Sequence, residues 1–377
     1  MKKKMYYSLR ELYHKFRNII SLSDKFKRRK IIKYIKRRIT FIEIKGKFVQ
    51  EKKDWIDSLI SMAKESSGLG LNNLQEILTG FLEEPLIQVK KADTFNSYKG
   101  VILVSAIKND IIYLRELLEY YRKIGVNHFA LIDNGSKDGT LEFLQKQRDV
   151  TLYTAPYKFK GRKKAGWKLQ VLAEIGLKRW YLWLDSDEFI VYKGIEDTDI
   201  NEFVAHLYQG GYMASHGFML DMYPDYPLMD GIHSNEDFLN DYRFYDPYNE
   251  YYEIALDTGI LTGGMRYRVM GAHGLRLDKY PLVYCYRNHI PFGNHNISGI
   301  KKAKKDKKYS CILKHYKFLP EDTEKYKIIS SGESGYLNPN EIKKYYNDDQ
   351  KKFIAYYEES RCYDNSHTCM GDFPFFN

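Results

Sequence analysis

The feature that most constrains the fold is a regular alternation of short apolar runs and helix-like segments between residues 101 and 184. Short apolar runs fit strands that are buried on both faces of a parallel sheet, and their alternation with helical spacing indicates repeated βαβ units. Ligands of such sheets bind beyond the carboxyl ends of the strands. We expect strands at 101–107, 129–132, 150–153 and 180–184, and helices at 111–124, 141–147 and 164–175.

The chain has 377 residues, of which 44% are hydrophobic, so it can form a sizeable core. We expect one α/β domain at 96–330, with a mostly parallel central sheet and helices on both faces. A helical N-terminal extension at 1–95 precedes it, and a helical tail at 331–377 follows it. A further strand is expected at 310–318, and a helix at 341–360.

Positive charge is concentrated at the N-terminus. Residues 1–53 hold 19 Lys and Arg against four Asp and Glu, a net +15, whereas the whole chain is +11 and the remainder is therefore −4. Ile31, Ile35, Ile39 and Ile42 recur at helical spacing with basic residues between them, which predicts a basic amphipathic helix. Its partner is either an anionic membrane surface or the protein's own body. Nucleic acid is not expected, because the basic residues are confined to this arm.

The four cysteines, at 285, 311, 362 and 369, include no C-x-x-C pair. This spacing disfavours a disulfide framework or a zinc site and favours a reducing compartment. The sequence has no run of about 20 apolar residues and no apolar segment typical of a secretory signal. A cytoplasmic protein, resting peripherally on the inner face of a membrane, is the expectation.

Two carboxylates follow the expected strand at 180–184 directly, in Asp185-Ser186-Asp187. If the strand continues, both side chains point to one face. Oxygen ligands arranged in this way suit Mg²⁺ or Mn²⁺, which bind one or two carboxylates together with substrate phosphates. The alternative is a capping pair at a junction between a strand and a loop.

An ordered series of motifs resembles the glycosyltransferase family 2-like group, which has the GT-A fold. The resemblance is strongest to the subgroup whose D-x-D motif reads DxDEF, and it covers roughly residues 100–365. The matching segments are Ile107-Lys108-Asn109-Asp110, Ile132-Asp133-Asn134-Gly135-Ser136, Asp185-Ser186-Asp187-Glu188-Phe189, Gly263-Gly264-Met265-Arg266-Tyr267-Arg268, Lys279-Tyr280-Pro281, Gly293-Asn294-His295 and Lys314-His315-Tyr316-Lys317-Phe318.

The resemblance implies a nucleotide-sugar site. Asp133 matches the aspartate that binds the nucleotide base, commonly uracil, with Ser105 and Ala106 beside it. Asp185 and Asp187 match the metal and diphosphate motif. His315 matches a late histidine that completes the metal shell, and an imidazole ligand suits Mn²⁺ better than Mg²⁺. The alternative for His315 is a strand histidine capped by a hydrogen bond.

Cations for the donor diphosphate are expected from two regions. The basic stretch at 160–168 contains Arg162 and Lys168, although relatives usually have Asn near position 168. Arg266, Arg268 and Lys279 are further candidates, and ordinary surface charge is the alternative for each. Inverting sugar transfer also needs a general base.

The candidate bases are Asp221, which follows an apolar strand, and Asp257. Together these features predict a metal-dependent enzyme that moves a sugar from a nucleoside-diphosphate donor, of UDP type, to a glycan or lipid-linked acceptor. Synthesis of a bacterial surface polysaccharide, with inversion, is the expected setting by analogy.

Three alternatives stay open at this point. They are a non-catalytic GT-A protein, a membrane- or nucleic-acid-binding module based on the basic arm, and a D-x-D phosphatase. The phosphatase is disfavoured because Phe189 stands where that motif requires Thr.

Overall fold

The computed structural model describes residues 23–37, 47–65, 69–228, 238–255, 260–286, 308–320, 323–331 and 354–374, and the single residues 290, 291, 293, 295, 297 and 376. Within this part of the chain, no helix is both long and apolar enough to cross a bilayer.

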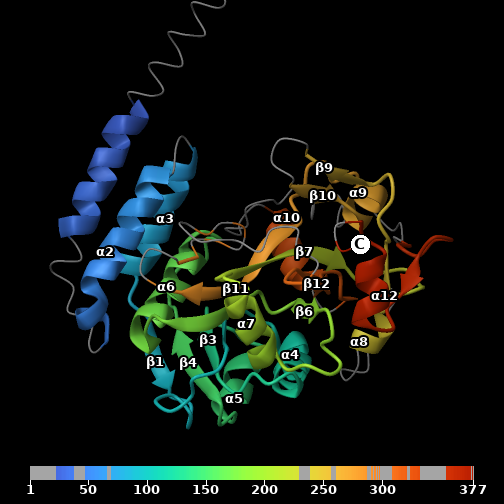
Figure 1. Ribbon diagram of the computed structural model, residues 1–377, viewed down its shortest axis with the longest axis horizontal. Coiled ribbons are helices and arrows are strands. Elements are labelled where there is room, and N and C mark those ends of the chain that lie inside the picture. The colour runs from blue at the N-terminus through green and yellow to red at the C-terminus, as the bar shows by residue number, and fades with distance from the viewer. Residues whose placement is uncertain are drawn as a thin grey trace, which may run out of the picture.

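A nine-stranded sheet forms the centre of the molecule, in the order β1-β4-β3-β2-β5-β11-β7-β12-β6 (Figure 1). Six strands run in one direction, and β1, β6 and β11 run against them. The predicted α/β class with a mostly parallel sheet is confirmed. The strands are β1 (Ile87–Lys90), β2 (Ile102–Ile107), β3 (Phe129–Asp133), β4 (Val150–Thr154), β5 (Arg179–Trp183), β6 (Glu188–Tyr192), β7 (Ala214–Asp221), β11 (Asp278–Cys285) and β12 (Cys311–His315).

Two hydrophobic cores lie on the two faces of this sheet. Strand β2 shows why, because Leu103 and Ile107 enter one core while Ile102 and Val104 enter the other, as side chains alternate along a strand. One core is covered by α4 (Ile111–Lys123), α5 (Thr140–Gln145) and α7 (Ile200–Gln209), and the other by α6 (Lys163–Ile175).

The N-terminal helices pack onto the second core. Helix α3 (Leu69–Leu82) lies against α6, and α2 (Lys47–Glu65) lies beside both, at one side of the sheet (Figure 1). A Cβ atom on Gly166 would stand 2.2 Å from the carbonyl oxygen of Ile77, so the close approach of α3 and α6 requires glycine there. The segment predicted to be an extension therefore shares its hydrophobic core with the sheet.

The basic helix also packs on the protein itself. Residues 23–37 are helical, and Ile31 and Ile35 are buried in the second core. Ile39 and Ile42 lie outside the described residues. The apolar face of this helix is thus occupied by the body of the protein, while Arg29, Lys33 and other cations remain exposed.

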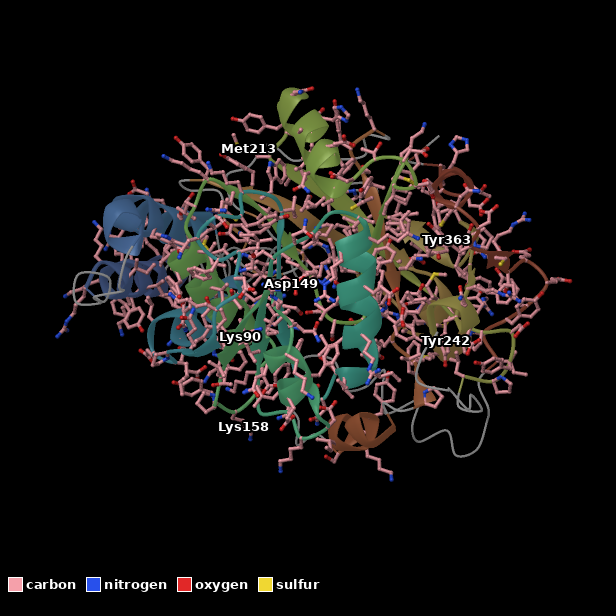
Figure 2. The ribbon with its side chains drawn as sticks, turned by 90° about the horizontal axis from the view of Figure 1, so that it is seen from below. Lys90, Asp149, Lys158, Met213, Tyr242 and Tyr363 are labelled. Carbon is pink, nitrogen blue, oxygen red and sulfur yellow. The ribbon has the colours of Figure 1, made fainter. Side chains whose placement is uncertain are left out.

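The C-terminal half adds smaller elements around the far end of the sheet. Figure 2 shows Tyr242 and Tyr363 on the opposite side of the molecule from the N-terminal helices. Phe373 and Phe376 pack into the first core, so the tail is docked as well. The elements are α8 (Phe238–Asp241), β8 (Phe244–Tyr245), β9 (Tyr252–Ile254), β10 (Leu261–Gly263), α9 (Met265–Met270), α10 (Thr323–Ser330), β13 (Arg361–Cys362) and α12 (Ser366–Gly371).

The helix expected at 341–360 does not extend through its last residues, because 354–360 are not helical. Residues 341–353 lie outside the described part of the chain.

Candidate functional site

The D-x-D motif occupies a turn between β5 and β6, and not the continuation of a strand. The expectation that strand geometry would align the two carboxylates is therefore wrong. Asp185 pairs with lysines from α6 and β11, whereas Asp187 pairs with His315 from β12. The motif thus joins two neighbouring clusters of charged side chains, because the turn directs its two carboxylates to different partners.

The first cluster is cationic and surrounds Asp185. Its Oδ1 lies 2.7 Å from Lys164 Nζ and 3.8 Å from Lys168 Nζ, and its Oδ2 lies 3.7 Å from Lys279 Nζ. Burial alone would raise the pKa of Asp185, but the three lysines outweigh it and hold this pKa well below its ordinary value. Asp185 is therefore ionised within a cage of positive charge.

Lys168 is fully buried and donates a hydrogen bond of 2.7 Å to the carbonyl oxygen of Leu184. Its Nζ also lies over the Trp183 ring, 5.1 Å from the centroid. Burial lowers the pKa of Lys168 to about 7, although Asp185 opposes the shift. Lys168 thus holds the end of β5 and lies within the cage around Asp185.

Lys279 has a second carboxylate partner. Its Nζ donates to Glu188, which is fully buried at the start of β6. Glu188 also accepts a 3.2 Å hydrogen bond from the backbone N–H of Asp185. Glu188 therefore fixes both the turn and the lysine.

The second cluster is a chain of buried side chains that ends at Asp187. His315 Nε2 lies 3.4 Å from Asp187 Oδ2, and His315 Nδ1 lies 2.7 Å from Asp221 Oδ1. Arg266 Nε donates to Asp221 Oδ2 at 2.7 Å. Sheet register explains the meeting, because His315 is the neighbour of Asp221 on β7 and of Glu188 on β6. The structure thus brings together residues that are far apart in sequence.

These contacts determine the protonation of His315 and Asp221. Burial would lower the pKa of His315, but the carboxylates of Asp187 and Asp221 outweigh it and raise this pKa. Burial would raise the pKa of Asp221, but Arg266 and His315 outweigh it and lower this pKa strongly. Both partners are therefore favoured in their charged forms when no metal ion is present.

Asp221 is not placed to act as the general base. It is 5% exposed, and its two carboxylate oxygens are engaged by His315 and Arg266. A base has to reach the proton of the acceptor hydroxyl, which a buried and paired carboxylate cannot do. The other candidate base, Asp257, lies outside the described residues.

The two clusters offer a place for a divalent cation. Ligand atoms of Asp187, Glu188 and His315 lie within 4.8 Å of one another. Two atoms bound to one ion at about 2.1 Å cannot be more than about 4.2 Å apart, and the 3.4 Å between Asp187 and His315 satisfies this limit. Glu188 is already bonded to Lys279, so Asp187 and His315 are the better pair of ligands.

The remaining expected residues are arranged differently. Asp133 is buried, and its carboxylate accepts hydrogen bonds from the backbone N–H groups of Gly135 and Ser136, at 3.0 and 3.2 Å. This carboxylate thus caps its own turn. Ser105 lies on the neighbouring strand β2, where Ile107 is paired with Asp133.

The other expected site residues are Ala106 and three arginines. Ala106 is half-buried beside Ser105, and Arg162 stands at the N-terminal end of α6. Arg266 and Arg268 are paired with Asp221 and Asp246 and are not among the lysine partners of Asp185.

Sequence reasoning missed two site residues. Lys164 lies in the basic stretch but was not singled out, although its spacing of four from Lys168 places both on one helical face. Asp110 accepts a 2.7 Å hydrogen bond from Ser186, the middle residue of the D-x-D turn. Asp110 stands in the matching segment Ile107-Lys108-Asn109-Asp110, but its contact with Ser186 depends on the adjacency of β2 and β5 and could not be read from that segment.

No protein-family model and no curated protein matches this sequence. Among solved structures, Staphylococcus aureus TarS 1–349 is similar with a TM-score of 0.28 and 13% identity, over 74% of this chain and 70% of that one. Mannosyltransferase PcManGT from Pyrobaculum calidifontis, in complex with GDP-Man and Mn²⁺, gives a TM-score of 0.25 and 14% identity over 41% and 44%.

HddC from Yersinia pseudotuberculosis gives a TM-score of 0.30 and 11% identity, over 60% of this chain and 97% of that one. Similarities of this size say nothing about activity, which has to be inferred from the site.

Proposed function

We propose that this protein is a metal-dependent glycosyltransferase that uses a nucleoside-diphosphate sugar. The observation that carries the proposal is the pairing of Asp187 with His315, 3.4 Å apart, directly beside the three lysines around Asp185. A half-site for a divalent ion next to concentrated positive charge suits a metal–diphosphate group. Both parts lie at the ends of β5 and β12, where ligands of such sheets bind.

The side chains of the site have complementary tasks in this proposal. Asp187 and His315 would hold Mn²⁺, or Mg²⁺ with water ligands, and the bound ion supplies Lewis-acid stabilisation of the diphosphate leaving group. Lys164 and Lys279, together with the protonated form of Lys168, add positive charge that is already in place when the bond between the sugar and the diphosphate breaks. The lysines also fix the side chain of Asp185, and this restrains the turn that carries Asp187.

Substrate identity is the finer part of the proposal. A uracil nucleotide with Asp133, Ser105 and Ala106 near its base, inversion at the sugar, and a glycan or lipid-linked acceptor of a surface polysaccharide are what the motif resemblance implies. Because the Asp133 carboxylate caps its own turn, base recognition would use its free lone pairs or the adjacent backbone.

An anionic membrane surface is proposed as a second partner. The helix at 23–37 buries Ile31 and Ile35 and exposes Arg29, Lys33 and Lys36. Contact with lipid would therefore be electrostatic, without insertion of this apolar face, and would weaken as salt shortens the Debye length below about 8 Å. Salt-insensitive binding to anionic vesicles would contradict this form of contact.

A ligand screen tests the proposed activity. Thermal stability of the full-length protein is measured with UDP-, GDP-, CMP- and dTDP-sugars, each with and without Mn²⁺, because a ligand bound only by the native state raises stability. Asp187→Ala should abolish the Mn²⁺-dependent shift, whereas Asp197→Ala, which removes an exposed carboxylate, should keep it. The proposal fails if no nucleotide sugar stabilises the protein, or if Asp187→Ala responds as the native protein does.

A further inference from the structure

We infer that Arg266 is a positioning residue for metal binding, acting through Asp221 to orient His315. The inference rests on the proposed function only in assuming that Asp187 and His315 hold a divalent cation. Arg266 would touch neither the metal nor the substrate. Its effect would pass through two hydrogen bonds between buried side chains.

The chain of contacts is continuous. Arg266 Nε donates to Asp221 Oδ2 at 2.7 Å, and His315 Nδ1 lies 2.7 Å from Asp221 Oδ1. The side chains of Arg266, Asp221 and His315 are only 2%, 3% and 6% exposed. Solvent therefore screens these contacts little, and none of the three side chains has much room to turn.

The bond to Asp221 determines which nitrogen of His315 is available. A histidine that donates Nδ1–H to a carboxylate presents the lone pair of Nε2 when it is neutral, and such outer partners fix the ring orientation of metal-binding histidines. Here Nε2 is the atom that faces Asp187. The geometry therefore orients the ring so that Nε2 becomes the ligand atom when a metal ion displaces its proton.

Arg266 holds the other oxygen of the same carboxylate. Without Arg266, one oxygen of the buried Asp221 carboxylate loses its partner, and the carboxylate would turn toward another donor or toward water. That movement disturbs the bond that orients His315. Arg266 therefore supports His315 indirectly, through Asp221.

The same helix supplies a matched comparison. Arg268, two residues along α9, makes an equivalent pair with Asp246 through Nε at 2.9 Å and Nη2 at 2.7 Å. It faces Tyr357, 3.8 Å from the ring centroid, and donates to the carbonyl oxygen of Ala355, both in the C-terminal segment. Loss of Arg268 therefore breaks a buried arginine–aspartate pair of the same kind without touching His315.

The test measures binding of Mn²⁺ alone to the full-length protein by isothermal titration calorimetry and by the EPR signal of free Mn²⁺. Arg266→Met should weaken Mn²⁺ binding by roughly 10-fold, the lower end of the effect of losing a direct hydrogen-bond partner of a metal ligand, because Arg266 acts through Asp221. Arg268→Met should keep the Mn²⁺ affinity within about threefold of the native value, even if it lowers the unfolding temperature as much as Arg266→Met does. Arg266→Lys should recover part of the affinity, because it restores a cation beside Asp221.

Outcomes separate this inference from the proposed function. If the native protein binds neither Mn²⁺ nor Mg²⁺, both are wrong. If it binds Mn²⁺ and Arg266→Met binds equally well, or if Arg268→Met loses the same affinity, only the positioning role is wrong. Should Arg266→Met fail to fold, Asp221→Asn replaces it, since it keeps the shape of the side chain and has to show the same weakening.

Discussion

Replacement of Lys279 by Met tests the charge balance of the site. The Lys279 side chain is 4% exposed, and that of its partner Glu188 is 0% exposed. Met keeps the length of the side chain but removes the charge, so Glu188 is left buried with one remaining hydrogen bond, from the N–H of Asp185. Breaking a buried pair in this way costs about 3–5 kcal/mol of folding free energy.

A second substitution should restore most of that loss. In Lys279→Met with Glu188→Gln, the buried charge is gone and the amide can still accept a hydrogen bond from Asp185. Replacing both partners of a buried pair by neutral groups is often close to neutral. We therefore expect the double variant to be more stable than Lys279→Met by at least about 2 kcal/mol. Lys193→Met, at an exposed lysine, should change stability by less than about 0.5 kcal/mol.

The assay is urea unfolding at pH 7, followed by tryptophan fluorescence and by far-UV circular dichroism, with free energies compared at equal m-values. Coincident transitions with the two probes are needed before a single free energy is read from the curves. If Lys279→Met is as stable as the native protein, or if the double variant is no more stable than the single one, the buried Lys279–Glu188 pair does not stabilise the fold.

Three further outcomes are expected. Burial, and to a lesser extent the positive charge of Arg179, lowers the pKa of His128 to about 4. The native protein should therefore lose ~3 kcal/mol of stability as the pH falls from 6.5 toward 4. This loss should be absent from His128→Gln when unfolding curves at pH 7 and pH 4.5 are compared. Gly166→Ala should lower the unfolding temperature sharply because of its 2.2 Å clash, while Gly371→Ala, with open space around it, should not. Ile35→Ala should cost about 2–5 kcal/mol if the basic helix is docked as described, and an unchanged unfolding curve would contradict that docking.

Local sequence patterns predicted the first half of the fold. All seven elements expected between 101 and 184 are present, with ends shifted by one or two residues. The strand expected at 310–318 is also found, as β12. Hydrophobic periodicity and turn-forming residues are local features of the sequence, so strongly patterned segments can be recognised without knowledge of their neighbours in space.

The antiparallel direction of β1, β6 and β11 was not predicted. Strand β6 is buried along its whole length and shows no alternating pattern. The docked position of Ile35 was likewise undecided, because an amphipathic helix shows an apolar face without showing what covers it.

The sequence by itself determined that two carboxylates follow a buried strand and that a histidine occurs late in the chain. Only the tertiary structure decided that they belong to different clusters. The turn after β5 directs Asp185 to the lysines, and the register of β12 with β6 and β7 places His315 between Asp187 and Asp221. Strand order and register are set by packing of the whole sheet, so side chains more than 90 residues apart meet for reasons that no local pattern contains.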